Sequence, residues 1–151
     1  MTSSQIVVGV DGSAESLAAL RWAIRRAARD HTTVTAVEVG HRPRLAPGTS
    51  YAIQPYGMAP PLERVTHSTR LHAAVVAAVG AMRGAPTVME LHVEGEPGVE
   101  LTRIAESAAM LVLGHSRRGR LAEFVLGGTA AECLRTARCP VVLVPADTVL
   151  D

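Results

Sequence analysis

Residues 110–145 carry the residue types and spacing best suited to hold a phosphate group. An apolar run, residues 110–113, leads directly into Gly114, and a polar loop rich in arginine follows. Gly127, Gly128 and Thr129 then open an amphipathic segment. A strand that runs into glycine and then into a helix N-terminus directs free amide N–H groups and the helix dipole at one spot. The spacing predicts an anion-binding cradle; the alternative is an ordinary connecting loop with solvated arginines.

A second polar turn follows the first apolar run, residues 5–10. Asp11, Gly12 and Ser13 come directly after it. Asp11 is a candidate contact for a nucleotide or for Mg²⁺, because this ion prefers oxygen ligands. The alternative is a structural Asx turn, in which Asp11 precedes Ser13, a good helix N-cap.

The loop after Gly114 contains further groups that could contact an anion. Arginines at positions 117, 118 and 120 supply three guanidinium groups, which bind phosphate through paired hydrogen bonds. His115 and Ser116 come first in this loop. His115 could contact a phosphate or could simply be solvated. No nucleophile, base and orienting residue form a recognisable set, so the sequence indicates no enzyme active site.

Apolar runs with the pattern of strands alternate along the chain with segments of helical periodicity. Strands are expected at residues 5–10, 33–39, 87–93, 110–113 and 141–144, and helices at 14–29, 62–83, 99–107 and 127–137. Such alternation predicts an α/β fold with a five-stranded parallel sheet, doubly wound, with helices on both faces. The half-polar third run is typical of an edge strand.

Ligands of doubly wound folds bind at the carboxyl ends of strands, where the winding reverses. The first and fourth strands both end in glycine-bearing turns, so we expect them to be neighbours, which gives strand order 3-2-1-4-5. One crevice then brings together Asp11, Val39 at the end of the second strand, the loop from Gly114 to Gly119, and residues 127–129.

Residues 40–61 separate the second strand from the second helix. The segment holds five of the nine prolines and both tyrosines, and it lacks periodicity. A long irregular connection inside a compact domain is usually functional or disordered. We interpret it as a mobile connection that could lie over the site.

Composition excludes several classes of function. With 151 residues, one domain spanning 1–151 is expected. The chain has no lysine, which excludes a Walker A loop and Schiff-base chemistry, and its charge of +1 favours neither nucleic acid nor an anionic membrane.

The sequence contains no apolar run long enough to span a membrane and no secretory signal. Cys133 and Cys139 are expected to be reduced core residues, as in a cytoplasmic protein.

Four motifs occur in an order that resembles the universal stress protein family over nearly the whole chain. They are IVVGVDGS, the turn EGEP, LVLGHSRRG, and LGGTAAECLRTARCPVVLVP. The resemblance implies a flavodoxin-like Rossmann variant of the adenine-nucleotide alpha-hydrolase type. It also implies a homodimer paired through the last strand, Val141 to Val144. Many members bind ATP and others bind none.

The resemblance also implies roles for individual residues. Asp11 and the backbone of Val10 would approach the nucleotide, the backbone of Val39 would read adenine, and Gly114 would start the phosphate loop. The whole implied set is Gly9, Val10, Asp11, Val39, Leu113, Gly114, His115, Ser116, Arg117, Gly119, Gly127, Gly128 and Thr129.

The sequence departs from the pattern of the ATP-binding members, which is Gly-x2-Gly-x9-Gly-Ser/Thr. Arg117 stands at the second glycine position, and Gly128 stands where a hydroxyl residue is expected. A one-residue insertion gives a shifted register, Gly114, four residues, Gly119, eight residues, then Gly128-Thr129, which recovers both glycines and the hydroxyl residue. In the unshifted register, Arg117 would either obstruct the loop or reinforce anion capture.

These observations lead to a hypothesis of function with three alternatives. The chain is expected to be a cytoplasmic ATP-binding regulatory or sensor module of the stress response, with Mg²⁺ as a candidate ion at Asp11. The first alternative is a dimeric interaction module without a ligand. The second is a slow ATPase in which Asp11 and a metal position water. The third is a binder of cyclic nucleotides in the same pocket.

Overall fold

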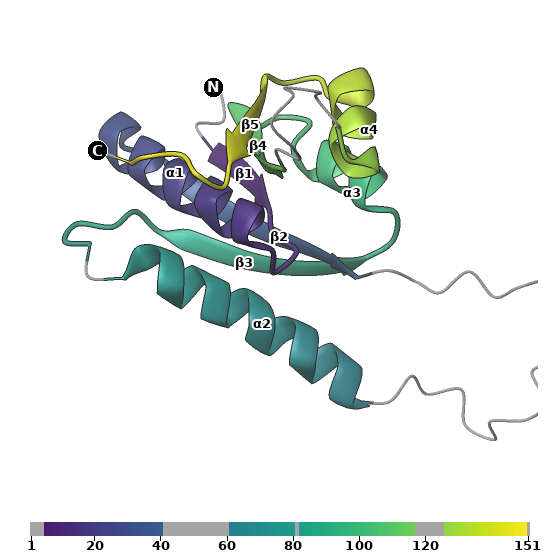
Figure 1. The fold of residues 1–151 in the computed structure, drawn as a ribbon, viewed down its shortest axis with the longest axis horizontal. Helices are drawn as coiled ribbons and strands as arrows, with labels where there is room; N and C mark the ends of the chain where they lie inside the picture. The colour runs from purple at the N-terminus through teal and green to yellow at the C-terminus, as the bar shows by residue number, and fades with distance from the viewer. Residues whose placement is uncertain (1–4, 41–60, 81, 117–125, 151) are drawn as a thin grey trace, which may run out of the picture.

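Five parallel strands form one sheet in the order β3-β2-β1-β4-β5 in the computed structural model (Figure 1). The structure describes residues 5–40, 61–80, 82–116 and 126–150. The predicted doubly wound α/β fold and its strand order are confirmed. The elements are β1 (Gln5–Gly9), α1 (Ala14–Asp30), β2 (Thr33–Gly40), α2 (Pro61–Val79), β3 (Val88–Glu94), α3 (Pro97–Ile104), β4 (Met110–His115), α4 (Gly128–Thr136) and β5 (Val141–Pro145).

Two separate cores lie on the two faces of the sheet. Alternate residues of a strand point to opposite faces, so neighbouring apolar residues enter different cores. Ile6 and Val8 of β1 pack with Leu20 and Ile24 of α1, and α2 joins this core. Val7 packs on the other face with residues of α3 and α4. Among the described helices, α1 and α2 therefore cover one face of the sheet, and α3 and α4 cover the other.

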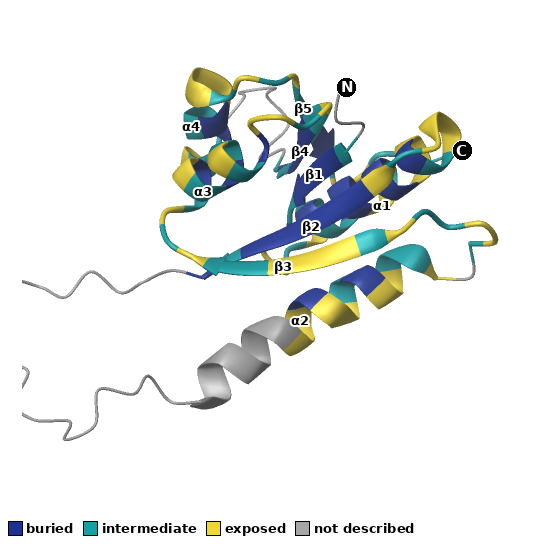
Figure 2. Ribbon diagram, turned by 180° about the vertical axis from the view of Figure 1, so that it is seen from behind, coloured by how far each residue is buried: buried dark blue, intermediate teal, exposed yellow. Residues whose placement is uncertain are grey.

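β1, β2 and β4 form the buried centre of the sheet, whereas β3 is an exposed edge (Figure 2). β1 pairs with β2 on one side and with β4 on the other, where Val7 lies opposite Leu111. β3 exposes Met89 and Leu91, in agreement with its predicted edge position. The carboxyl ends of β1 and β4 are adjacent, which places the reversal of winding between them as expected.

β4 is longer than the sequence predicts. The predicted strand ends at Leu113, but Gly114 and His115 continue it and pair with Val144 and Pro145 of β5. Parallel pairing with β5 therefore extends through a glycine that sequence reasoning interprets as the start of a loop.

The predicted mobile connection falls largely outside the described residues. Gly40 is the last residue of β2 and Pro61 is the first of α2, and residues 41–60 lie outside the described ranges. Within the parts of the chain that the structure describes, no helix has the length and apolar character needed to cross a membrane.

Candidate functional site

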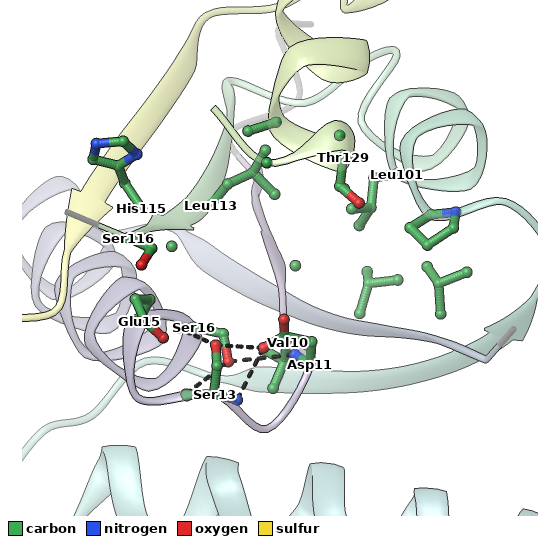
Figure 3. A pocket seen from close by; sticks show the side chains of 18 residues that line it. Val10, Asp11, Ser13, Glu15, Ser16, Leu101, Leu113, His115, Ser116 and Thr129 are labelled. Atoms are coloured by element: carbon green, nitrogen blue, oxygen red, sulfur yellow. Dashed lines mark hydrogen bonds between the residues drawn. The ribbon is translucent and has the colours of Figure 1, made fainter. Parts of the chain in front are cut away.

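A cavity of about 430 Å³ opens at the carboxyl edge of the sheet, where the winding reverses (Figure 3). The ends of β1, β2 and β4 and the first turns of α1, α3 and α4 surround it. Its size is in the range of small-molecule sites. The lining residues are Gly9, Val10, Asp11, Ser13, Glu15, Ser16, Val37, Val39, Pro97, Leu101, Leu113, Gly114, His115, Ser116, Gly127, Gly128, Thr129 and Ala130.

The structure brings together all of the predicted site residues that it describes. Those from β1, β2, β4 and α4 line this one cavity. Arg117 and Gly119, on which the two registers of the loop depend, lie outside the described residues. The choice between the registers therefore stays a prediction.

Asp11 forms the structural turn that was the alternative to a ligand contact. Its Oδ1 accepts hydrogen bonds from the Ser13 N–H at 2.9 Å and from the Ser13 hydroxyl at 2.5 Å. The Ser13 Oγ in turn accepts from the Ser16 N–H and caps α1. Figure 3 shows the three side chains gathered on one wall of the cavity. The carboxylate therefore both holds the turn and borders the cavity.

The hydrogen bonds around Asp11 favour its charged form. Partial burial acts to raise the pKa of the Asp11 carboxyl, but hydrogen bonds from Ser13 and Ser16 outweigh it, and the pKa lies below its ordinary value. Asp11 is therefore ionised at neutral pH.

Gly114 is required by packing. A Cβ on this residue would lie 2.5 Å from the backbone carbon of Glu15 and 2.6 Å from the backbone nitrogen of Ser16. Both atoms belong to the first turn of α1, which cannot move aside as a flexible side chain can. Gly114 thus allows β4 to pass directly against the N-terminus of α1, a role that needs no ligand.

Gly127 and Gly128 are different, because the described fold does not require glycine at either position. A Cβ on either residue would meet nothing within 4 Å, and neither residue has a positive φ. Gly127 is the N-cap of α4 and makes no side-chain capping bond. The N–H groups of Gly128, Thr129 and Ala130 begin the helix and have no acceptor within it. The cavity is therefore bordered by the positive end of a helix dipole.

His115 is buried, whereas the sequence places it in a polar loop. It is 7% exposed and is the last residue of β4, because pairing with β5 continues that far. Its ring points away from the group of Asp11, Ser13 and Ser16 in Figure 3. The reading of His115 as a solvated loop residue is wrong.

Sequence reasoning did not include several lining residues, among them Glu15, Val37 and Leu101. Val37 could have been found, since it lies two residues before Val39 and faces the same side of β2. Leu101 comes from α3, and no local sequence signal connects that helix with the cavity. Asp11 and Glu15 are the only charged side chains, His115 aside, among the described lining residues.

The described residues include no group of three or more His, Cys, Asp or Glu side chains that could hold a metal ion. Beside Asp11, the oxygen ligands of a cation in this cavity would come from other groups, such as water or a bound molecule. Mg²⁺ commonly binds in this way, through one or two carboxylates together with phosphate oxygens.

Cys133 and Cys139 are free thiols and form no disulfide with another described residue. Cys133 is fully buried, and its S–H donates to the Gly98 carbonyl at 3.9 Å. Burial, with smaller contributions from Glu132 and Cys139, raises the pKa of the Cys133 thiol to about 11. Burial also raises the pKa of Cys139. Both thiols are protonated at neutral pH, as expected of core residues.

The sequence profile of the universal stress protein family matches residues 3–145. The chain belongs to this family. A universal stress protein of Mycolicibacterium smegmatis is 36% identical over 152 residues, covering 97% of this chain and 49% of that protein. The chain therefore spans about half the length of the curated relatives that it matches.

Solved structures of the family have the same fold. A universal stress protein in complex with cAMP superposes with a TM-score of 0.65 and 23% identity, covering 97% of this chain and 100% of that one. The universal stress protein of Archaeoglobus fulgidus in complex with dAMP gives a TM-score of 0.64 and 21% identity, covering 95% and 99%. At these identities the likeness shows the fold alone.

Proposed function

We propose that this universal stress protein binds an adenine nucleotide in the cavity between the ends of β1, β2 and β4 and the N-terminus of α4. The observation that carries the proposal is the first turn of α4, whose N–H groups have no acceptor within the helix and where a Cβ on Gly127 or Gly128 would meet nothing within 4 Å among the described residues. Helix N-termini of this kind hold phosphate groups. The relatives of known structure with bound cAMP and dAMP support the same ligand class.

The two sides of the cavity suggest how the nucleotide is oriented. Val37, Val39 and Leu113 give an apolar surface suited to the adenine ring, and the N-terminus of α4 suits the phosphate. The backbone of Val39 would read adenine, and Asp11 would approach the ribose or a Mg²⁺ ion. Under this proposal Thr129 supplies the hydroxyl beside the phosphate, as in the shifted register of the loop.

The charge of the cavity bears on the choice of nucleotide. Asp11 and Glu15 are carboxylates, and no Arg or Lys is found among its described lining residues. The two carboxylates repel a free triphosphate, so on their own they favour AMP or cyclic AMP, or ATP neutralised by Mg²⁺; Arg117, Arg118 and Arg120 lie outside the described residues. ATP with Mg²⁺ thus remains part of the proposal, and competition among the three ligands ranks them.

Binding in the cavity would serve regulation of a stress response in the cytoplasm, with at most a slow ATPase activity. The whole chain, residues 1–151, would act as one domain, and nucleotide binding would shift a surface or dimer equilibrium. Phosphate release above that of an Asp11→Ala control would favour the slow ATPase instead.

The second candidate function, an interaction module, draws support from β5. This strand is the outermost one on its side of the sheet, and Val141, Val142 and Leu143 remain partly exposed. An apolar edge strand is a template for pairing with another strand. We propose a homodimer through Val141 to Val144, to be tested by native mass spectrometry of the wild type and of Leu143→Pro, because the register of β4 and β5 turns the Leu143 N–H toward the free edge of the sheet.

Thermal unfolding with and without nucleotide tests the binding proposal. Ligand at about 100 times its dissociation constant should stabilise the folded state by roughly 2.7 kcal/mol. Millimolar AMP, cyclic AMP and ATP with Mg²⁺ are the probes, and native mass of the purified protein shows whether nucleotide is already bound. A dimer that carries no nucleotide and shows no thermal shift with any probe would instead favour the ligand-free interaction module.

A further inference from the structure

A buried carboxylate lies directly behind the cavity. Glu38 of β2 is 1% exposed, between Val37 and Val39, which line the cavity from the opposite face of the sheet. Glutamate is almost never fully buried without a partner. The sequence gives no sign of this arrangement, because residues 33–39 read as an ordinary apolar strand.

Two described partners of Glu38 come from α2 and β3. Arg70 of α2 approaches Oε1 with its Nε at 2.7 Å and with an η nitrogen at 2.6 Å. His92 lies opposite Glu38 in the register of β2 and β3, with its Nδ1 3.3 Å from Oε2. The buried carboxylate thus fixes the position of the Arg70 side chain at the end of the sheet.

Arg70 also lies against the turn that forms one wall of the cavity. Its Cδ is 3.0 Å from the position that a Cβ on Gly12 would occupy. Gly12 has a φ of +84° and links Asp11 to Ser13, both of which line the cavity. Arg70 therefore contacts the turn from outside, while Ser13 and Ser16 hold it from within.

We propose that Arg70, held by Glu38, is a positioning residue for nucleotide binding. It fixes the turn of Asp11, Gly12 and Ser13 relative to the end of β2. It thereby sets the distance between this turn and the residues of β2 that line the cavity. Only the Glu38 side of this ion pair is buried, and the Arg70 side chain is 47% exposed, so the pair is weak evidence for stability; its fixed geometry still suits such a role. The inference rests on the proposed function.

The chain offers a matched control on the same helix. His72 of α2 pairs with Glu90 of β3, with 2.8 Å between Nδ1 and Oε1. This pair also joins α2 to the edge of the sheet, but it is more exposed, and neither residue lines the cavity. His72→Gln therefore alters a link between the helix and the sheet without touching the turn.

The experiment compares Arg70→Met and His72→Gln with the wild type, using AMP as the probe at a temperature where all three are folded. Arg70→Met is expected to weaken AMP binding about fivefold, the equivalent of about 1 kcal/mol, and His72→Gln to leave it unchanged. In the free proteins, the amide signals of Gly12 and Ser13 should shift in Arg70→Met and not in His72→Gln. Glu38→Gln should reproduce both effects in part, because it removes the carboxylate charge that pairs with Arg70.

Unchanged AMP affinity and unchanged amide signals in Arg70→Met, with only a lower unfolding temperature, would show a purely structural ion pair and overturn the inference. If Arg70→Met does not fold, Arg70→Lys takes its place, since it keeps the charge but loses the fork of two nitrogens. It should give a smaller loss of affinity in the same direction, and wild-type affinity would again overturn the inference. If the wild type binds no AMP, the proposed function fails by itself, and the amide signals alone decide whether Arg70 sets the turn.

Discussion

Gly114 and the pair Gly127-Gly128 both border the candidate site, and they are glycine for different reasons. At Gly114 a Cβ would meet the backbone of α1 at 2.5 Å, so packing between β4 and α1 excludes any side chain. At Gly127 and Gly128 a Cβ would meet nothing within 4 Å. Gly114 is required by packing, whereas Gly127 and Gly128 leave room beside the N-terminus of α4.

The difference shows which glycines of the motif indicate a ligand site and which are needed for packing alone. Sequence reasoning treats all of these glycines as parts of one phosphate cradle. In the structure, Gly114 would be needed even in a relative that binds nothing, whereas Gly127 and Gly128 have no such structural reason among the described contacts. The proposal of nucleotide binding therefore rests on the start of α4.

Replacing Gly114 by alanine should have the largest effect on stability. The added methyl group overlaps backbone atoms of Glu15 and Ser16, and overpacking of this kind costs about 3 kcal/mol. Urea unfolding would measure the loss, and the midpoint of thermal unfolding should fall by about 10 °C. A variant as stable as the wild type would mean that Gly114 is not held by packing.

Replacing Gly128 by alanine should separate affinity from stability. The methyl group enters open space, so the free energy of unfolding should stay within about 0.5 kcal/mol of the wild type. Affinity for AMP should fall about tenfold, because the methyl group occupies space beside the phosphate. Calorimetric titration gives the affinity for AMP, and urea unfolding of the same sample gives the free energy of unfolding. Full affinity in this variant would mean that Gly128, contrary to the proposal, is not needed for the ligand.

Replacing Gly12 by alanine tests a third kind of glycine, one held by its backbone conformation. Its φ of +84° is unfavourable for a side chain, and the added methyl group would press on the flexible Arg70 stem. The expected loss is about 1 kcal/mol, smaller than at Gly114, because a side chain yields more easily than a helix backbone. Urea unfolding of both variants in parallel would check this ranking, which equal losses would contradict.

The smallest expected effect concerns the pH dependence of the Asp11 turn. The folded protein lowers the pKa of Asp11, so the stabilisation is present above the ordinary pKa of aspartate and is lost as pH falls through the folded value. Asp11→Asn should therefore reduce the loss of stability on acidification below about pH 4. Urea midpoints at several pH values would reveal it; identical pH profiles in both proteins would show that Asp11 does not contribute.

The fold could be predicted from the sequence because each element carries a local signal. Alternating strand and helix patterns, with glycine turns after the first and fourth strands, were sufficient for the observed order of strands. The end of β4 was misplaced, because pairing of Gly114 and His115 with β5 is a long-range effect that a local pattern does not contain.

The site was predictable only in part. Asp11, Val39 and residues 127–129 came together as expected, since the carboxyl ends of parallel strands meet at one edge. Glu38 was missed because its partners, Arg70 and His92, are 32 and 54 residues away along the chain. A buried charge is recognised from its surroundings, and the sequence of β2 alone shows only one glutamate among apolar residues.

The most direct test of nucleotide binding at α4 is an amide NMR titration of the wild-type protein with AMP. The account predicts that the signals of Gly127, Gly128, Thr129 and Ala130 shift together with those of Val10 and Asp11, along one saturation curve. The signals of Gly80 and Gly84, which do not line the cavity, should stay in place. Shifts that spare the first turn of α4, or no shifts at millimolar AMP, would contradict the account.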